Sequence, residues 1–216
     1  MFTGIIAATG HISRLTVKGG DLEVQIHSEQ LDFSDVQLGD SIASNGVCLT
    51  VTQLLAQGFV ADVSAETLAL TRFSQYQVGQ RVNLEKALLA TSRLGGHLVS
   101  GHVDGVTELL RIEKTARAWQ LWFAMPAALA PYLAHKGSVT IDGVSLTVNE
   151  LSATAFRLTI VPHTAAQTTL LQLQKGSLVH IEVDLIARYL ERLLHTKTPA
   201  PTTGVDLALL AQRGFL

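Results

Sequence analysis

The chain has 216 residues, of which 47% are hydrophobic and 16% charged, so it can bury a real core and lacks the composition of a disordered protein. Its net charge of −2 and its scattered basic residues give no electrostatic basis for binding nucleic acid. A single cysteine excludes an internal disulfide, and the sequence shows neither a signal peptide nor an apolar run of roughly eighteen residues. We therefore expect a cytoplasmic protein without nucleic-acid or membrane partners.

The first half of the chain has the pattern of short strands separated by turn residues. Apolar and alternating runs predict strands at residues 3–8, 10–17, 22–27, 40–54, 58–63 and 81–84. Strands at this spacing favour a closed antiparallel barrel of six strands, which leaves no exposed edge. Short helices are expected at residues 66–73 and 85–91, the second leading into a linker at residues 93–96.

The second half repeats this plan, with strands at residues 121–124, 138–148, 155–161 and 178–183. Pro126 suits a first helical turn and predicts a helix through Ala134. From Asp184 to His195, apolar residues recur at helical spacing behind an N-terminal capping residue. This helix has no counterpart in the first half. Packing on its own barrels and a helix-to-helix contact in an oligomer both remain open.

The tail after this helix is expected to begin with a Pro/Thr linker at residues 197–203. A short final helix at residues 205–213, ended by Gly214, would complete the chain.

One stretch of the chain occurs twice. Residues 44–51 (Ser-Asn-Gly-Val-Cys-Leu-Thr-Val) match residues 141–148 (Ile-Asp-Gly-Val-Ser-Leu-Thr-Val), 97 positions later. The same offset aligns Thr3-Gly4 with Ser100-Gly101 and Glu85 with Glu182. A repeat of this length is the size of a small domain. We therefore predict two homologous barrels, at residues 1–96 and 97–183, followed by a helix and tail at residues 184–216.

The two copies differ at polar positions on a shared frame. The differing pairs are Ile5 with His102, Gly39 with Lys136, Cys48 with Ser145, and Glu66 with His163. Gly46 and Gly143 are expected to let the backbone approach a ligand closely, although a plain hairpin turn explains either copy alone. Two like molecules held in unlike barrels would suit a reaction between two copies of one substrate, because positioning alone lowers a bimolecular barrier.

Two histidines lie in a glycine-rich stretch between the halves. His97 and His102 are placed for acid–base chemistry, and their spacing also raises the question of a metal. No second pair of ligands completes such a site, so we expect no metal. Cys48 can equally be a small buried residue, and nothing near it in sequence lowers its pKa. The sequence has no Walker loop and no dinucleotide-binding motif.

Four motifs, at residues 1–6, 44–51, 96–105 and 142–148, together resemble the riboflavin synthase alpha-chain family, over residues 1 to about 194. The resemblance implies two six-stranded barrels and a C-terminal helix that holds a homotrimer together. It implies that each active site forms between the N-terminal barrel of one subunit and the C-terminal barrel of its neighbour. The implied reaction is the dismutation of two 6,7-dimethyl-8-ribityllumazine molecules to riboflavin and 5-amino-6-(D-ribitylamino)uracil, without a cofactor. Association with lumazine synthase remains open.

The resemblance also implies site residues. In the first barrel, the implied ligand contacts are Gly4, Ile5, Ile6, Cys48, Leu49, Thr50, Asp62, Val63, Ser64, Ala65, Glu66 and Thr67. In the second barrel, they are Gly101, His102, Val103, Lys136 across the interface, Ser145, Leu146, Thr147, Val161, Pro162, His163, Thr164, Ala165 and Ala166. The implied catalytic residues are Phe2, Ser41, Cys48, His102, Ser145, Thr147 and Asp184.

Each catalytic group has a hypothetical role. His102 with Thr147 would assist proton removal from the 7-methyl group, and Cys48 and Ser145 would hold or activate the water that adds at C7. Phe2 would pack on the ring or close the N-terminal segment over it. His163 stands where the family commonly has an acidic residue, so the contact there, and its pH dependence, is expected to differ.

Two rival functions differ from this expectation. A non-catalytic lumazine or flavin antenna protein would need polar groups in one barrel only, whereas this chain has them in both. A flavin reductase barrel would need a nucleotide-binding domain, for which 216 residues leave no room. The fold alone would not decide between them.

Overall fold

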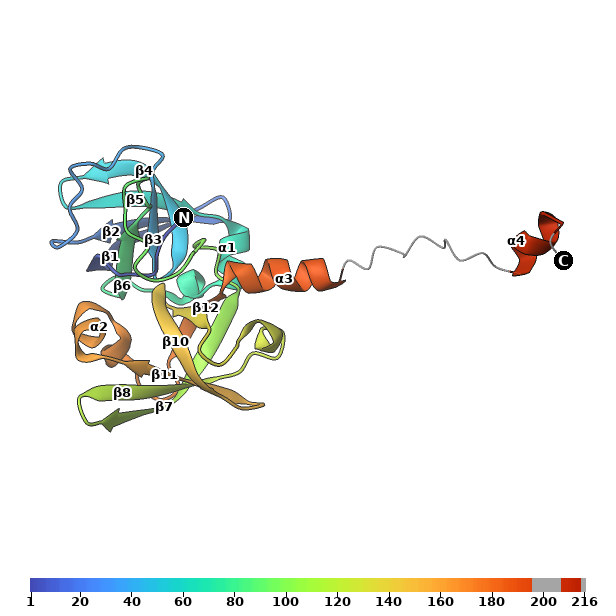
Figure 1. Ribbon diagram of the computed structural model, residues 1–216. Helices are drawn as coiled ribbons and strands as arrows, with labels where there is room; N and C mark the ends of the chain where they lie inside the picture. The colour runs from blue at the N-terminus through green and yellow to red at the C-terminus, as the bar shows by residue number, and fades with distance from the viewer. Residues whose placement is uncertain (196–206, 215–216) are drawn as a thin grey trace.

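Two closed β-barrels follow one another along the chain in this computed structural model, which describes residues 1–195 and 207–214 (Figure 1). The first barrel has the strand order β1-β2-β5-β4-β3-β6. Its strands are β1 (Ala8–Lys18), β2 (Asp21–His27), β3 (Ser41–Ser44), β4 (Val47–Leu55), β5 (Gly58–Val63) and β6 (Arg81–Lys86). All neighbours pair antiparallel, and β1 closes the barrel against β6.

The second barrel has the equivalent order, β10-β11-β8-β7-β12-β9. Its strands are β7 (Gly105–Thr115), β8 (Ala118–Ala124), β9 (Ser138–Ile141), β10 (Val144–Leu151), β11 (Ala155–Ile160) and β12 (Leu178–Val183). Each barrel encloses its own apolar core, built around Phe59 and Phe73 in the first barrel and Phe123 and Phe156 in the second. The predicted fold, all-β with short helices and two tandem six-stranded antiparallel barrels, is confirmed.

The duplication extends to irregularities of the strands. The register of β1 on β2 shifts between Ile12 and Arg14, and that of β7 on β8 shifts between Leu109 and Arg111. A second shift, after Val51 in β4, recurs after Val148 in β10. Bulges of this kind bend a strand and increase its twist, which helps a short sheet to close on itself. The same sequence offset therefore sets the curvature of both barrels.

The repeated glycines lie where the two barrels meet. Asn45-Gly46 and Asp142-Gly143 form the β3–β4 and β9–β10 turns, and all four residues have positive φ. A Cβ added to Gly46 would lie 2.8 Å from the backbone nitrogen of Gly143, and one added to Gly143 would lie 2.7 Å from that of Gly46. The prediction that these glycines make room for a ligand is wrong, because each makes room for the backbone of the other.

A buried polar network surrounds these turns. Asn83 Nδ2 donates to the carbonyl of Asp142 at 2.9 Å, and His180 Nδ1 lies 2.8 Å from the carbonyl of Asn45. Asn83 Oδ1 accepts from the backbone of Thr169, and His180 Nε2 accepts from that of Arg72. Asn83 and His180 are counterparts under the repeat, so an amide and an imidazole make the same pair of cross-barrel bonds.

Burial shifts the pKa values of two groups in this network. It lowers the pKa of His180 to about 4 and raises the pKa of Asp142 to about 7. Since Nε2 accepts from an N–H, the neutral ring carries its proton on Nδ1.

The local structure departs from prediction in three places, namely two predicted helices and one predicted strand. The segments at residues 66–73 and 162–172 are helical as short α-helices with 3₁₀ turns, namely α1 (Ala65–Leu70), η1 (Arg72–Gln75), α2 (Pro162–Gln167) and η3 (Leu170–Gln172). The helix predicted at residues 85–91 is wrong, because Glu85 and Lys86 end β6. Between Pro126 and Ala134, only η2 (Ala130–Tyr132) is helical. Residues 3–7, predicted as a strand, precede the single strand β1 and bridge between the barrels instead.

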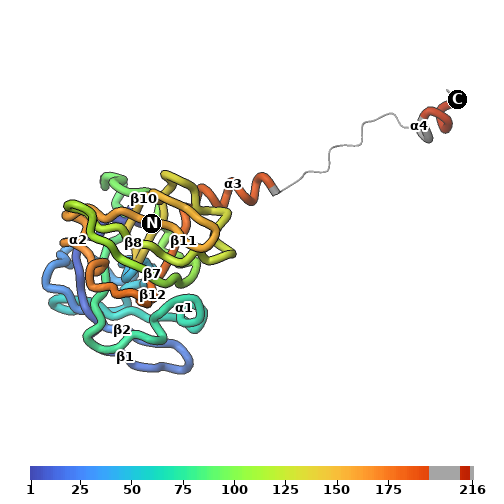
Figure 2. Tube along the Cα trace, turned by 90° about the horizontal axis from the view of Figure 1, so that it is seen from below, coloured from blue at the N-terminus to red at the C-terminus, as the bar shows by residue number. Residues whose placement is uncertain are grey.

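The C-terminal helix α3 (Leu185–His195) extends away from the barrels in both views (Figures 1 and 2). Asp184 caps it by accepting from the backbone of Ile186 at 2.9 Å, as predicted. The linker expected at residues 197–203 lies outside the described residues. Only part of the final helix is described, as α4 (Leu207–Gln212), with Gly214 at positive φ after it.

Candidate functional site

The repeated strand β4 turns its polar residues out of the first barrel. Along residues 47–51, Leu49 and Val51 are buried inside, whereas Cys48 is half-buried and Thr50 exposed on the outer face. Beside Cys48 lies a pocket of about 260 Å³. It is lined by Val47, Cys48, Glu66, Thr67, Leu70, Thr71, Gly101, His102 and Val103. Cys48 and Thr50, two positions apart on the strand, therefore point the same way.

This pocket combines residues that the sequence assigned to different barrels. The backbone of Cys48 donates to the carbonyl of Gly101 at 2.8 Å, and the backbone of Ser145 donates to the carbonyl of Gly4 at 2.7 Å. Val103 belongs to the core of the first barrel, and Ile6 packs against that of the second. The segments ahead of the two barrels are therefore exchanged. Grouping residues 4–6 with Cys48 and residues 101–103 with Ser145 was wrong.

Two glutamates hold the exchanged segments. Glu85 of β6 accepts from the backbone and hydroxyl of Thr3 at 2.7 and 2.6 Å, and from the backbone of Gly4 at 2.9 Å. Glu182 of β12 repeats all three bonds with Ser100 and Gly101. Burial raises the pKa of both carboxyl groups, and the hydrogen bonds oppose it. The aligned pairs seen in the sequence thus serve to fix the segments that border each site.

Phe2 lies behind this pocket and is fully buried. It packs with Val99, Ala43 and Cys48, and its backbone pairs with that of Val99. A Cβ added at Gly101 would lie 2.8 Å from the Phe2 ring and 2.7 Å from the Cβ of Cys48. Of the two roles expected for Phe2, this packing favours the one that fixes the N-terminal segment, since the ring is buried by protein.

The counterpart of Cys48 in the second barrel has a different neighbour. Ser145 of β10 is half-buried, and its Oγ lies 2.8 Å from Nδ1 of His97. His97 is buried, whereas His102 is exposed at the first-barrel pocket. The two histidines of the glycine-rich stretch therefore serve different barrels. Among the described residues, no group of three or more His, Cys, Asp or Glu side chains is placed to hold a metal ion.

The short helices that border the sites also differ. Ser64 caps α1, where its Oγ accepts from the backbone of Thr67 at 3.2 Å. In α2 the equivalent residue is Val161, which offers no side-chain cap, and Pro162 occupies the first turn. Glu66 and His163 are both exposed, so the acidic group of one site is replaced by an imidazole in the other.

The other predicted site residues differ in how far they are buried. Those buried inside the barrels can meet a ligand only through their backbone; these are Leu49, Val63, Leu146 and Ala165. Those exposed on the outer surface are Ile5, Thr50, Asp62, Ala65, Lys136, Thr147 and Ala166, and Thr164 is half-buried. Lys136 has a φ of 65°, where its counterpart Gly39 has 91°, so a side chain stands where the first barrel has none. Ser41 lines a separate pocket of about 410 Å³ that includes Thr3 and Arg93.

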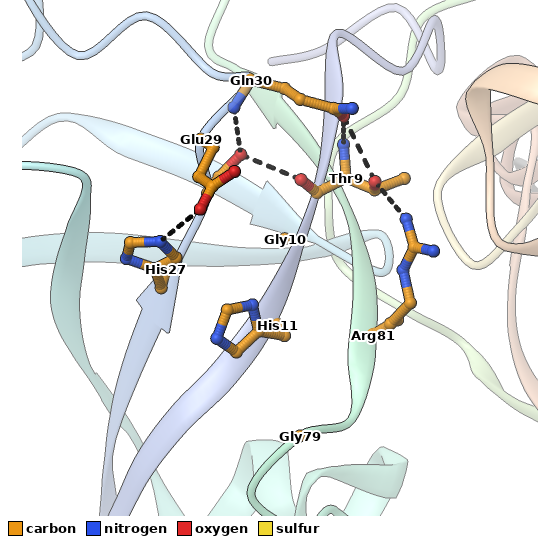
Figure 3. A pocket seen from close by; sticks show the side chains of 9 residues that line it. Thr9, Gly10, His11, His27, Glu29, Gln30, Gly79 and Arg81 are labelled. Atoms are coloured by element: carbon orange, nitrogen blue, oxygen red, sulfur yellow. Dashed lines mark hydrogen bonds and ion pairs between the residues drawn. The ribbon is translucent and has the colours of Figure 1, made fainter.

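A further polar pocket of about 400 Å³ lies on the first barrel, away from Cys48 (Figure 3). The rings of His11 and His27 lie in tilted contact with their centroids 5.1 Å apart, and Arg81 donates to the hydroxyl of Thr9 at 2.7 Å. Figure 3 shows Glu29 beside His27, and Glu29 Oε1 lies 4.0 Å from His27 Nε2. The sequence analysis did not find this cluster, because His11 and Arg81 meet only across the β1–β6 pairing.

Comparison with known families identifies both halves. The lumazine binding domain matches residues 3–87 and again residues 100–184. These ranges begin at Thr3 and Ser100, the first residues that the two buried glutamates hold. The family therefore counts each exchanged segment with the barrel that follows it in sequence.

Characterised relatives resemble the chain along its whole length. The riboflavin synthase of Photobacterium phosphoreum is 52% identical over 217 residues and covers 100% of both chains. That of Photobacterium leiognathi is 53% identical, over 90% of this chain and 89% of its own. That of Bacillus subtilis is 41% identical and again covers 100% of both.

A solved structure shares the fold at lower identity. LumP in complex with riboflavin superposes with a TM-score of 0.78 and 25% identity, over 85% of this chain and 99% of that one. LumP thus shares the fold, but the relatives named riboflavin synthase are far closer in sequence. With both lumazine binding domains present and full-length identities of 41% to 52%, the chain belongs to the riboflavin synthase family.

Proposed function

We propose that the chain catalyses the dismutation of 6,7-dimethyl-8-ribityllumazine, in which one molecule gives a four-carbon unit to another. The products are riboflavin and 5-amino-6-(D-ribitylamino)uracil. This proposal rests on one observation. The same arrangement on the outer face of a strand occurs in both barrels, on β4 and β10, but with different polar groups. Cys48, His102 and Glu66 border the first copy, and Ser145 and His97 belong to the second. Two bound molecules of the same kind would meet different chemistry, as a dismutation requires.

The direct test is to incubate the purified protein with 6,7-dimethyl-8-ribityllumazine alone and to follow absorbance, with products identified by mass. We expect one riboflavin for every two lumazines consumed. Tight binding with bright fluorescence and no riboflavin would contradict the proposal and favour the antenna function of the LumP type.

The proposed active site joins two subunits. Within one chain, His102 lines the first-barrel pocket, and Thr147 is exposed on β10 of the second barrel. Their expected cooperation in proton removal therefore needs the first barrel of one subunit to face the second barrel of another. In that arrangement Cys48 and Ser145 would flank the adding water from opposite subunits, and Lys136 would reach across.

The helix α3 supports a homotrimer. Its polar residues face the second barrel, where Arg188 pairs with Asp104 and Glu191 with Tyr132. Its apolar residues face outward, since Tyr189 is 64% and Leu194 is 77% exposed. An exposed apolar stripe of this kind commonly marks an interface. We therefore place the trimer contact on this face and extend the same proposal to the inter-subunit sites.

The oligomer is tested by sedimentation of the wild type and of Leu194→Lys, with Arg213→Ala as an exposed control. We expect a trimer for the wild type and the control, and smaller species with reduced activity for Leu194→Lys. A monomeric wild type with full activity would contradict the inter-subunit site. We also propose a cytoplasmic location, for which the single free cysteine is the support. None of the described helices is long and apolar enough to cross a membrane.

A further inference from the structure

His97 contacts Ser145, the residue of the second barrel that corresponds to Cys48 of the first. Its Nδ1 lies 2.8 Å from Ser145 Oγ, and its backbone donates to the carbonyl of Thr3 at 3.1 Å. The backbone of Gly96 lies close to the same serine, since a Cβ added there would lie 2.8 Å from Ser145 Oγ and 2.1 Å from the Thr3 carbonyl. The serine hydroxyl is therefore fixed between an imidazole and the backbone.

The second ring nitrogen of His97 has no partner. Only 8% of the residue is exposed, and within the described part of the chain its Nε2 forms no hydrogen bond. A buried polar atom without a hydrogen-bond partner is uncommon in folded proteins and needs an explanation. In the neutral imidazole one ring nitrogen carries the proton and the other is an acceptor, so a ring with its proton on Nε2 can accept from the serine hydroxyl at Nδ1.

The electrostatic surroundings agree with this geometry. Burial lowers the pKa of His97 below its usual value, and the carboxylate of Asp184 partly offsets the effect. Asp184 stands at the start of α3, whereas Thr3, Gly96 and Ser145, which contact the ring or its backbone, are uncharged. Asp184 would therefore stabilise an imidazolium formed briefly during turnover.

The first barrel has no such pair. In the part of the chain that the structure describes, no side chain forms a hydrogen bond to the thiol of Cys48, the counterpart of Ser145. His102 lines the pocket near Cys48 but is exposed to solvent. The barrels thus differ in proton-accepting capacity at the same position of the repeat.

We propose that His97 is a positioning residue that acts through Ser145 and makes the second barrel the one that activates water. The inference rests on the proposed function. Ser145 Oγ takes a proton from the water that adds to the bound ring, and the serine's own proton passes to Nδ1 of His97. One O–H bond of water and one of Ser145 break, one O–H and one N–H bond form, and the hydroxide adds to C7. The proton returns by the same route when the C7–O bond breaks.

The first test separates His97 from a merely structural role. His97→Asn keeps a hydrogen-bonding atom near the position of Nδ1 but cannot take the proton, and His97→Ala removes both. We expect kcat to fall about 100-fold in both variants, with KM near the wild-type value for His97→Asn only. In a Ser145→Ala background, His97→Asn should cause no further loss. Full activity of His97→Asn, or losses that multiply in the double variant, would overturn the proposal.

The pH profile gives a second readout. Protonated His97 cannot accept from Ser145, so wild-type kcat should fall below a pKa lower than 6.5, and His97→Asn should lack this acidic limb. His11→Asn, the same change at an exposed histidine on β1, is the matched control and should leave the profile unchanged. Retention of the acidic limb in His97→Asn contradicts the inference.

A measurement without turnover distinguishes this inference from the proposed function. Nitrogen-15 NMR of the labelled histidines, with His97 assigned from His97→Asn, reports which ring nitrogen carries the proton. We expect a proton on Nε2 and a hydrogen-bonded lone pair on Nδ1 that changes in Ser145→Ala. A proton on Nδ1 overturns the inference even if riboflavin is formed. If the wild type gives the expected spectrum but forms no riboflavin, the proposed function and the water step are overturned. The His97–Ser145 contact would still be established.

Discussion

The two barrels share the residues that join them and differ in the residues that border their sites. Glu85 and Glu182 make the same three hydrogen bonds, and the turns at Gly46 and Gly143 approach each other equally. In contrast, Cys48 and Ser145 are counterparts under the repeat, and among the described residues only the serine has a buried histidine partner. The two copies are thus alike in the residues that join the barrels and differ in the residues where a bound molecule would lie. A duplicated domain can in this way supply two different environments for one kind of ligand.

The barrel-to-barrel contact should be the most sensitive part of the shared frame. Gly46→Ala combines a positive φ with a 2.8 Å approach to the backbone of Gly143, so we expect a loss of about 3–5 kcal/mol in unfolding free energy. Gly79→Ala is the matched control, because its φ is 91° and nothing lies within 4 Å of the added Cβ. It should cost only about 1 kcal/mol. Urea unfolding measures both, and equal losses would contradict a close contact between the turns.

The exchange of segments predicts an effect that crosses from one barrel to the other. Glu182 belongs to the second barrel but holds Gly101, whose carbonyl bonds to Cys48 of the first. Glu182→Gln replaces one acceptor oxygen with an NH2 group, so a buried backbone N–H loses its partner, at about 1–3 kcal/mol, and thiol labelling of Cys48 should speed up about tenfold. Glu85→Gln, which loosens the segment beside Ser145, should speed it less. The exchange would be refuted by the reverse order of labelling rates.

The pH dependence of stability distinguishes His180 from its counterpart Asn83. The folded-state pKa of His180, about 4, lies below its unfolded value of 6.5, so the unfolded chain binds more protons between these values. Its contribution to stability is therefore lost as pH falls through this window. Asp142, with a pKa raised to about 7 from 3.8, acts in the opposite direction, and stability is lost as pH rises from 3.8 to 7. The two effects nearly cancel between pH 4 and 6.5.

His180→Asn removes one of these effects and keeps both cross-barrel bonds in the form that Asn83 uses. We expect the variant to lose stability from pH 4 to pH 7, by about 2–3 kcal/mol relative to the wild type over this range. Denaturant unfolding at several pH values measures this slope. Parallel curves for the two proteins would show that His180 does not titrate in this range.

The smallest expected difference concerns the helices beside the sites. Ser64→Ala removes the side-chain cap of α1 and should cost about 1 kcal/mol. Val161→Ser offers α2 the cap that it lacks and should gain a few tenths of a kcal/mol to about 1 kcal/mol. Ser74→Ala, at an exposed position, is the control. A loss of stability in Val161→Ser would mean that Pro162 already satisfies the first turn of α2.

Local sequence patterns predicted much of the fold because residues along a barrel strand alternate between the buried core and the outer face. The alternation at residues 22–27 and the repeated stretch at residues 44–51 were enough to expect paired six-stranded barrels, and Asp184 indicated the start of α3. The helix predicted at residues 85–91 failed because Glu85 is a buried strand residue whose carboxylate binds backbone of another segment. Helical propensity cannot anticipate a partner that is 82 positions away in the sequence.

The sequence predicted which residues belong to the candidate site better than it predicted how they are arranged. The repeat pointed to Cys48 and Ser145 because the copies differ there, and the glycine-rich stretch pointed to His97 and His102. Which histidine serves which barrel depends on the exchange of the segments ahead of the barrels, and no residue spacing encodes that exchange.

The sequence by itself determined the duplication, most of the barrel strands, the capped C-terminal helix and the positions at which the copies diverge. These follow from periodicity and from comparison of the chain with itself, which are local or one-dimensional properties. Only the tertiary structure decided that Gly46 meets Gly143, that Gly101 borders Cys48, and that His97 contacts Ser145. The first two contacts join different repeats, and the third joins the glycine-rich stretch ahead of the second barrel to strand β10. All three depend on close packing and hydrogen bonds between segments that are far apart in the sequence.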